Sequence, residues 1–274
     1  MRSPMEMILE CVDVPEGLRS LLPRRWERIG DVLLLKLDDR IMPHARAVAE
    51  AYSEVLGVRA VLRDLGVYGP YRTPRVERIL GEDTETWHRE NGVLFRIDPA
   101  RVIFSSGNID ERIRMATIAS AGERVVDMFA GIGYFIVPMA LHSGVTGWAY
   151  EINPVSHRFL VETLRANGVE DRVTPVLANC MDAPEGVADR VIVGYLSGTD
   201  RYLEKAMRIV RPGGGLIHCH MACPVELIPE RPMAIVESAA GKVGGEAEIV
   251  RLHEVKSYAP GVDHIVLDIR FNTA

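Results

Sequence analysis

The sequence Val-Val-Asp-Met-Phe-Ala-Gly-Ile-Gly-Tyr-Phe at residues 125–135 decides the fold of this chain. Its first residues are typical of the end of a buried parallel strand, and residues 134–142 favour a helix. Between them, residues 130–133 form a turn with little side-chain bulk. Gly131 and Gly133 let the backbone adopt a positive φ and approach a ligand closely. The pattern predicts a strand, a tight turn and a helix beside a bound ligand.

An acidic residue, Glu151, closes the next apolar run, residues 146–150. At the end of a second parallel strand, a carboxylate can accept hydrogen bonds from both hydroxyls of a ribose. Each such bond to a charged group contributes about 1.5 to 3 kcal/mol. Ile136 occupies the place of the third glycine in a dinucleotide-binding pattern, which disfavours a pyrophosphate. The sequence therefore predicts a nucleoside-type cofactor, best matched by S-adenosylmethionine. A tight turn without a ligand is the alternative.

The composition favours one large domain or two unequal domains. The chain has 274 residues, of which 47% are hydrophobic, enough for a sizeable core. No apolar run is long enough to cross a membrane, and early acidic residues do not match a signal peptide. Four scattered cysteines do not form a disulfide framework. We therefore expect a cytoplasmic protein without a membrane partner.

The net charge of −6 argues against indiscriminate binding of nucleic acid. In the N-terminal part, however, every basic residue except Lys36 is arginine, and the planar guanidinium suits phosphate. A phosphate-tracking surface and a solvated arginine-rich face are both compatible with this pattern. The arginines concerned lie in residues 71–78 and at Arg96, Arg101, Arg112 and Arg114.

Residues 1–98 are predicted to form a small α+β domain. Apolar residues at helical spacing follow Pro43, which suits the first turn of a helix. Asn91-Gly92 tolerates the positive φ of a type I′ turn and so predicts a hairpin. The predicted elements are a strand at residues 31–37, a helix at 43–58, a strand at 59–62 and hairpin strands at 85–89 and 93–97.

Residues 99–274 alternate strands with helices, which predicts an α/β domain with a parallel, doubly wound sheet. A final antiparallel pair of strands is expected at the sheet edge. This layout is that of a Rossmann-like, class I S-adenosylmethionine-dependent transferase domain. The predicted strands are residues 124–128, 147–150, 173–177, 190–193, 216–219, 248–258 and 262–271, and the later helices are residues 154–167, 199–210 and 233–243.

Four features are considerably more specific in combination than a general cofactor motif. They are residues 125–135, Tyr-Glu-Ile-Asn-Pro at 150–154, Phe-Ser-Ser-Gly-Asn-Ile-Asp-Glu-Arg at 104–112, and Asn179. Together they resemble the family that modifies the purine on the 3′ side of the anticodon. It contains the tRNA guanine-37 N1-methyltransferases and the tRNA wybutosine-synthesis aminocarboxypropyltransferases, here in the archaeal form. The resemblance covers residues 29–274 and implies that both domains act as one unit on a tRNA.

The segment after the fourth predicted parallel strand separates two branches of that family. The N1-methyltransferases carry there an Asn-(Leu or Pro)-Pro type motif that contacts the guanine, whereas this chain has Gly194-Tyr195-Leu196. Without the Asn side chain, a site that must read a base edge loses a polar contact. The sequence here, like that of residues 104–108, resembles the aminocarboxypropyl branch. A tRNA guanine-37 N1-methyltransferase is the alternative.

The resemblance implies transfer of the 3-amino-3-carboxypropyl group of S-adenosylmethionine to 4-demethylwyosine at position 37 of phenylalanine tRNA. The by-product is methylthioadenosine, whereas methyl transfer leaves S-adenosylhomocysteine. The sulfonium activates three carbons, so the enzyme selects the product by orientation, which can supply about 7 to 11 kcal/mol. Contact with the anticodon arm is implied, while protein partners and the proton acceptor are not assigned.

Matched positions imply roles for the cofactor site. Glu151 holds the ribose, Asn179 and the backbone of Cys180 hold the adenine, and Phe129 packs beside the cofactor above the turn at Gly131. A cap on a turn is the alternative for Asn179.

The same resemblance places Ser105 and Arg112 at the methionyl portion, with Arg112 paired to its carboxylate. Gly194, Tyr195 and Leu196 are the candidates that border the flipped-out base, on which an aromatic ring can stack. Alternatives are an ion pair of Arg112 with an acid on its own helix and a core position for Tyr195.

The run His218-Cys219-His220, with Cys223, suggests a metal site at first. Adjacent residues of a strand point to opposite faces, so only the two histidines share a side. No second Cys-x-x-Cys pair completes a tetrahedral set. We therefore expect no metal.

Overall fold

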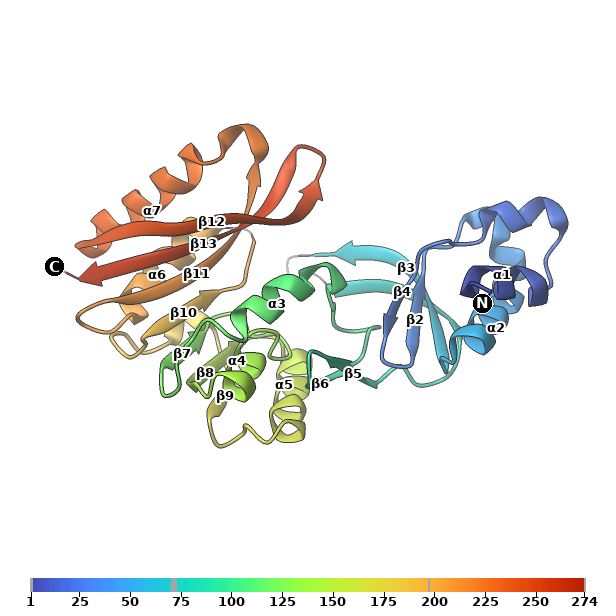
Figure 1. Cartoon of the computed structure of the whole chain (residues 1–274), viewed down its shortest axis with the longest axis horizontal. Coiled ribbons are helices and arrows are strands. Elements are labelled where there is room, and N and C mark those ends of the chain that lie inside the picture. Colours follow the sequence, from blue (N-terminus) through green and yellow to red (C-terminus); the bar gives the residue numbers. More distant parts are fainter. Residues whose placement is uncertain (1, 70–72, 197, 274) are drawn as a thin grey trace. The chain divides into compact units, whose positions relative to one another are not determined.

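The computed structural model describes residues 2–69, 73–196 and 198–273. The chain forms two compact units, Met1–Ser106 and Gly107–Ala274 (Figure 1). The division follows Ser106, whereas the sequence analysis placed it after residue 98. Residues 71 and 72 of the arginine-rich run lie outside the described residues.

The N-terminal unit contains a four-stranded sheet in the order β1-β2-β3-β4. The predicted strand-helix-strand order is confirmed, because β2 and β3 pair in parallel and α2 lies between them in the chain. The elements are α1 (Pro4–Cys11), η1 (Glu16–Leu21), β1 (Glu27–Ile29), β2 (Val32–Leu35), η2 (Asp39–His44), α2 (Ala45–Leu56), β3 (Ala60–Tyr68) and β4 (Thr73–Leu80).

A separate hairpin of the N-terminal unit matches its prediction closely. It consists of β5 (Thr86–Glu90) and β6 (Val93–Ile97). Asn91 and Gly92 have φ values of 47° and 78°, as a type I′ turn requires. One face of the hairpin is buried through Thr86, Val93, Phe95 and Ile97, so its other face carries the outward side chains.

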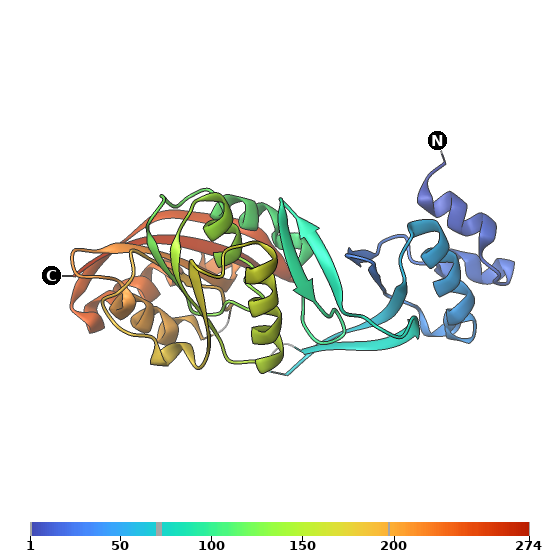
Figure 2. The ribbon, with the colours of Figure 1, turned by 90° about the horizontal axis from the view of Figure 1, so that it is seen from below.

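The C-terminal unit contains a seven-stranded sheet in the order β12-β13-β11-β10-β7-β8-β9 (Figure 2). Strands β11, β10, β7, β8 and β9 are parallel, and β13 and β12 continue the sheet antiparallel at its edge, as predicted. The strands are β7 (Arg124–Asp127), β8 (Thr146–Glu151), β9 (Val173–Leu177), β10 (Arg190–Val193), β11 (Gly215–Pro224), β12 (Gly245–Ala259) and β13 (Val262–Thr273).

Helices lie on both faces of this sheet. Leu203 and Met207 of α6 and Val236 of α7 share one core with Cys219 of β11. The neighbouring residue His220 points the other way and contacts the ring of Phe135, just before α4, at 4.9 Å between centroids. The sheet is therefore doubly wound. The helices are α3 (Ile109–Met115), α4 (Ile136–His142), α5 (Pro154–Ala166), α6 (Thr199–Ile209) and α7 (Glu230–Val243).

Of the arginines considered for a phosphate-tracking surface, Arg112 is buried and Arg114 is partly buried. Arg112 is 3% exposed. Arg114 donates to Glu111 at 2.7 Å and to Asp268 at 2.8 Å. That part of the interpretation was wrong, because a distant carboxylate on β13 compensates the charge of Arg114 inside the C-terminal unit.

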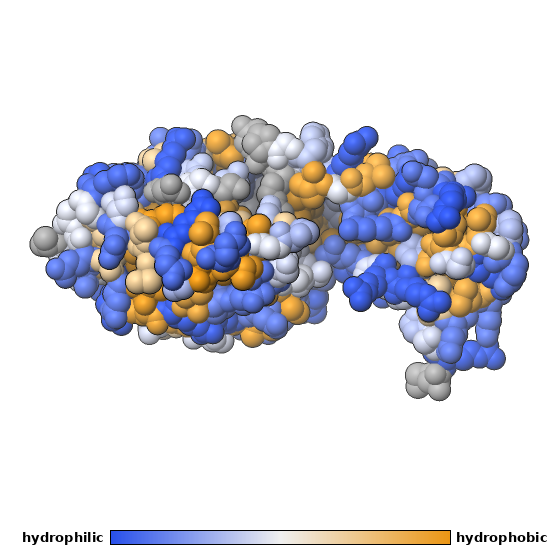
Figure 3. Space-filling model, turned by 90° about the horizontal axis from the view of Figure 1, so that it is seen from above, coloured by the Kyte–Doolittle hydropathy of each residue, from blue (hydrophilic) through white to orange (hydrophobic). Residues whose placement is uncertain are grey.

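The surface hydropathy and the lengths of the helices bear on any contact with a membrane. Hydrophilic residues surround smaller hydrophobic patches on the face shown in Figure 3, which is typical of folded proteins. Among the residues that the structure describes, no helix is long and apolar enough to span a membrane.

Candidate functional site

The turn after β7 has the close backbone packing that its glycines predict. Gly131 and Gly133 have φ values of 58° and 96°. A Cβ atom at Gly131 would lie 2.5 Å from the ring of Tyr134, and one at Gly133 would lie 2.4 Å from the side chain of Val137. Both positions therefore require glycine for their conformation and for their packing.

The carboxylate of Glu151 lies directly at this turn. Its Oε2 accepts from the backbone N–H of Gly131 at 2.8 Å, and its Oε1 accepts from that of Asn153 at 2.7 Å. Burial raises the pKa of Glu151, against these hydrogen bonds, which lower it. Each carboxylate oxygen can accept a further bond. The predicted pairing of turn and acid is present, and it leaves acceptor capacity for ribose hydroxyls.

Asp127, at the end of β7, is a second buried acid beside the turn. Its Oδ1 accepts from the N–H of Phe129 at 3.1 Å. Its Oδ2 has no hydrogen-bond partner among the described residues. Burial, helped by the charge of Glu151, raises the pKa of Asp127 to about 7. The sequence analysis assigned this residue no role, although an acid that ends an apolar strand is a usable signal.

The predicted adenine-binding residues follow β9. The Oδ1 atom of Asn179 accepts from Met181 N–H at 3.0 Å and caps the 3-10 helix Cys180–Asp182, so the capping alternative is observed. Ala178 N–H donates to Glu151 O at 3.2 Å, which joins the ends of β8 and β9. Burial raises the pKa of the Cys180 thiol to about 11, so this thiol is neutral at physiological pH.

Three aromatic rings meet at the same edge of the sheet. Phe129 and Tyr195 stack with 5.2 Å between centroids and 17° between planes. Tyr202 of α6 stands edge-on to Phe129 at 4.8 Å and to Tyr195 at 5.9 Å. The sequence analysis missed Tyr202. Its position in the first turns of the helix after β10 is the available signal, because such residues face the carboxyl edge of a parallel sheet.

The other base-pocket candidates continue from β10. A Cβ atom at Gly194 would lie 3.5 Å from the ring of Phe135, so this residue leaves little bulk there. Leu196 O accepts from Ala222 N–H at 3.2 Å, which ties the segment to β11. Gly194 and Tyr195 are both partly buried. The structure therefore brings Gly194 and Tyr195 to the edge that also holds Phe129.

Arg112 is positioned by α3 near the glycine turn. Burial raises the pKa of Tyr134, and the charges of Arg112 and Glu151 act on that pKa in opposite directions. Arg112 and Glu151 therefore each lie within electrostatic reach of the Tyr134 hydroxyl. The neighbouring acid Glu111 binds Arg114 and His253. Ser105 belongs to the other unit, and its role stays a prediction.

The histidines of β11 bind protein groups. His218 Nδ1 lies 2.6 Å from Asp268 Oδ1, and His220 Nδ1 lies 2.9 Å from His264 Nε2. Cys219 lies in the core on the opposite face. Within the described ranges, no group of three or more His, Cys, Asp or Glu side chains is arranged to hold a metal ion.

Comparison with known families agrees with this arrangement. Residues 86–250 match the TRM5/TYW2 methyltransferase domain, and residues 5–84 match the TYW2 N-terminal domain. The chain belongs to the TRM5/TYW2 family. The family predicted from the sequence motifs is thereby confirmed, together with the Rossmann-like fold.

Similar proteins of this family cover almost the whole chain. It is 42% identical to the tRNA(Phe) (4-demethylwyosine(37)-C(7)) aminocarboxypropyltransferase of Pyrococcus horikoshii, over 94% of this chain and 93% of that protein. The crystal structure of P. horikoshii TYW2 in complex with MeSAdo superposes with a TM-score of 0.90 at 40% identity, covering 98% of this chain and 100% of that one. The tRNA (guanine(37)-N(1))-methyltransferase Trm5b of Pyrococcus abyssi is 33% identical, over 95% and 79%.

Proposed function

We propose that this protein transfers the 3-amino-3-carboxypropyl group of S-adenosylmethionine to 4-demethylwyosine at position 37 of phenylalanine tRNA. The observation that carries the proposal is the 42% identity to an aminocarboxypropyltransferase over 94% of the chain. The Gly194-Tyr195-Leu196 segment, which has no Asn, supports the same choice. Methylthioadenosine is the by-product.

The proposed reaction is a single nucleophilic displacement at carbon. The ring carbon C7 of the acceptor base attacks the methylene carbon next to the sulfonium, and the bond between that carbon and sulfur breaks. The electron pair stays on sulfur, which becomes a neutral thioether, and the ring loses the proton from C7. The protein has to align carbon, methylene and sulfur, since orientation alone distinguishes this methylene from the methyl group.

The C-terminal unit supplies groups suited to each part of the co-substrate. Glu151 receives the ribose hydroxyls, because its two oxygens keep acceptor capacity beside the turn. Asn179 and the backbone at Cys180 receive the adenine, and Phe129 packs beside it. This assignment is supported by the common location of these residues at the ends of β7, β8 and β9.

The methionyl portion and the base complete the proposed site. Arg112 binds the carboxylate of the methionyl portion as a charge-assisted contact, with Ser105 as its partner in that role. Tyr195 stacks on the flipped-out base, supported by its parallel contact with Phe129, while Gly194 and Leu196 border it. The N-terminal unit supports binding of the anticodon arm.

Separate isotopic labels test the proposed transfer. The purified protein is incubated with tRNA containing 4-demethylwyosine and with S-adenosylmethionine labelled either in the methyl group or in the carboxyl group. The proposal requires the carboxyl label in tRNA and the methyl label in methylthioadenosine. A parallel sample of tRNA with unmodified guanine at position 37 tests the alternative. Incorporation of the methyl label alone into that tRNA would show instead the N1-methyltransferase activity, which the 33% identity to Trm5b supports.

A further inference from the structure

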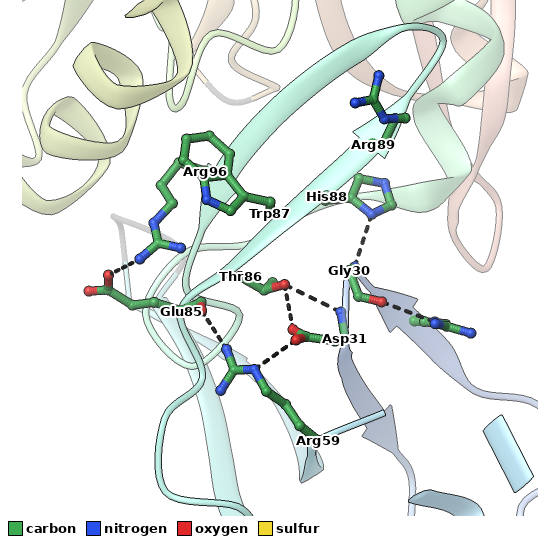
Figure 4. Close-up of a pocket in the computed structure, with 10 residues that line it drawn as sticks. Gly30, Asp31, Arg59, Glu85, Thr86, Trp87, His88, Arg89 and Arg96 are labelled. Carbon is green, nitrogen blue, oxygen red and sulfur yellow. Dashed lines mark hydrogen bonds and ion pairs between the residues drawn. The ribbon is translucent and has the colours of Figure 1, made fainter. Parts of the chain in front are cut away.

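A cleft of about 620 Å³ lies wholly within the N-terminal unit, and none of its lining residues is a candidate for the cofactor or base site. It opens between the β1–β2 turn and strand β5 (Figure 4). Four arginines, two carboxylates, a tryptophan and a histidine dominate its walls. The lining residues are Arg28, Gly30, Asp31, Arg59, Glu85, Thr86, Trp87, His88, Arg89 and Arg96.

The floor of the cleft is held by a dense set of hydrogen bonds. Gly30 N–H donates to His88 Nδ1 at 3.2 Å, and Asp31 N–H donates to Thr86 Oγ1 at 3.3 Å. The Thr86 hydroxyl in turn donates to Asp31 Oδ1 at 2.6 Å. A Cβ atom at Gly30 would lie 2.2 Å from Thr86 Oγ1, so glycine permits this approach. A preorganised floor reduces the ordering cost of binding.

Two of the four arginines have their charge compensated within the cleft. Arg59 donates to Asp31 Oδ2 at 2.7 Å and to the backbone carbonyl of Glu85. Arg96 donates to Glu85 Oε2 at 2.8 Å. These two pairs use both carboxylates of the lining and hold the side chains of the cleft walls in place. The net charge of the cleft is therefore set by the other two arginines.

The remaining two arginines keep an uncompensated positive charge. Arg28 donates to the carbonyl oxygens of Gly30 and Leu56, each at 3.0 Å, and neither acceptor is charged. Arg89 is exposed. Among the described residues, neither Arg28 nor Arg89 forms an ion pair with a carboxylate. The cleft therefore favours an anion.

An aromatic surface lies beside this charge. Trp87 is 43% exposed, and the guanidinium carbon of Arg96 lies 5.3 Å from the centroid of its ring. Trp87 pairs with Arg96 across the hairpin, and Arg89 lies two positions further along β5, on the same outward face. Exposed aromatic rings next to arginines are the combination by which proteins hold a base and its phosphate.

We propose that this cleft binds a nucleotide of the tRNA substrate outside the reacting position. Arg28 and Arg89 contact backbone phosphate. A base stacks on the Trp87 ring, next to the guanidinium of Arg96. The inference rests on the proposed function, because it takes tRNA as the substrate. Of the arginines that the sequence offered for a phosphate-tracking surface, Arg96 lines this cleft, whereas Arg112 and Arg114 belong to the C-terminal unit.

Binding of phenylalanine tRNA to the full chain tests this site, by fluorescence anisotropy at several salt concentrations. Trp87→Ala should raise the Kd about 5- to 100-fold, since stacking contributes at this level. Trp87→Phe, which keeps a ring, should restore most of the affinity. Arg89→Ala should weaken binding and lower the slope of log Kd against log salt by about one. Arg24→Ala, also exposed in the N-terminal unit, is the matched control and should leave both quantities unchanged.

Three further measurements separate this site from the cofactor site and from misfolding. The variants should bind S-adenosylmethionine as the wild type does in calorimetry and unfold at the same temperature. Their KM for tRNA should rise while kcat at saturating tRNA stays unchanged. Wild-type affinity for tRNA in both Trp87→Ala and Arg89→Ala overturns the proposal. Failure of the labelling experiment with intact tRNA binding overturns only the proposed reaction.

Discussion

The glycine turn after β7 and the β1–β2 turn of the N-terminal unit share a backbone feature but lie beside charges of opposite sign. In each, a glycine with positive φ, Gly131 or Gly30, allows a neighbouring segment to come closer than a side chain permits. Beside Gly131 the charged group is the partly buried carboxylate of Glu151. Beside Gly30 the exposed guanidinium of Arg59 pairs with Asp31, and further arginines lie around it. The first site therefore suits hydroxyl donors of a nucleoside, and the second suits phosphate.

The largest effect is expected from removing the carboxylate of the first site. Glu151→Ala deletes the two proposed hydrogen bonds to ribose, together about 3 to 6 kcal/mol, and should raise the Kd for S-adenosylmethionine at least about 100-fold. Isothermal titration calorimetry measures this, with Glu170→Ala as an exposed acidic control on the same unit. Glu151→Gln, which keeps the shape, should lose less. An unchanged Kd in Glu151→Ala would remove Glu151 from the cofactor site.

A smaller effect is expected from adding a methyl group at each turn. Gly131→Ala and Gly30→Ala introduce both a strained φ and a clash, and each should cost about 1 to 3 kcal/mol of unfolding free energy. Gly57→Ala has a φ of +63° but nothing within 4 Å of the added carbon. It is therefore the control for strain alone and should cost less in urea unfolding. Equal costs in all three variants would show that the close approaches are unimportant.

The two glycine variants should also differ in which ligand they bind less tightly. Gly131→Ala should weaken binding of S-adenosylmethionine and leave tRNA affinity near the wild-type value. Gly30→Ala should do the reverse, because it displaces the wall of the arginine-lined cleft. If both variants lost the same ligand, the assignment of separate ligands to the two turns would be wrong.

The pH dependence of stability gives a further test at the first turn. Burial raises the pKa of Asp127 to about 7, above its value of about 3.9 in an unfolded chain. The folded state therefore binds more protons between these values, so this residue makes the unfolding free energy fall as pH rises from about 4 to about 7. Asp127→Asn should flatten that part of the profile measured by urea unfolding. A wild-type profile in the variant would show that Asp127 is already ionised.

Local patterns in the sequence predicted most of the elements and the meeting of the glycine turn with Glu151. Alternation of apolar runs located the parallel strands, Asn91-Gly92 located the hairpin, and the spacing of Gly131 and Glu151 brought both to one edge. These predictions succeeded because the residues that determine each feature lie within a few positions of one another or in one βαβ unit. Strand β4 was missed because it mixes charges with Pro74, which an edge strand tolerates.

Contacts between distant segments could not be predicted in the same way. Arg114 looked like a surface cation because its partner Asp268 lies on another strand, 154 residues away. The arginine-lined cleft depends on Asp31 meeting Thr86 across 55 residues. Whether a charged residue lines a cleft, forms an ion pair or binds a ligand depends on partners that are distant in the chain. A single sequence does not specify those partners.

Mass spectrometry of the modified nucleoside tests the proposed activity most directly. The protein is incubated with S-adenosylmethionine and tRNA carrying 4-demethylwyosine, and the tRNA is digested to nucleosides. The proposed function predicts that the nucleoside at position 37 gains the mass of a 3-amino-3-carboxypropyl group, with methylthioadenosine formed in equal amount. A gain of one methyl group, accompanied by S-adenosylhomocysteine, would contradict it.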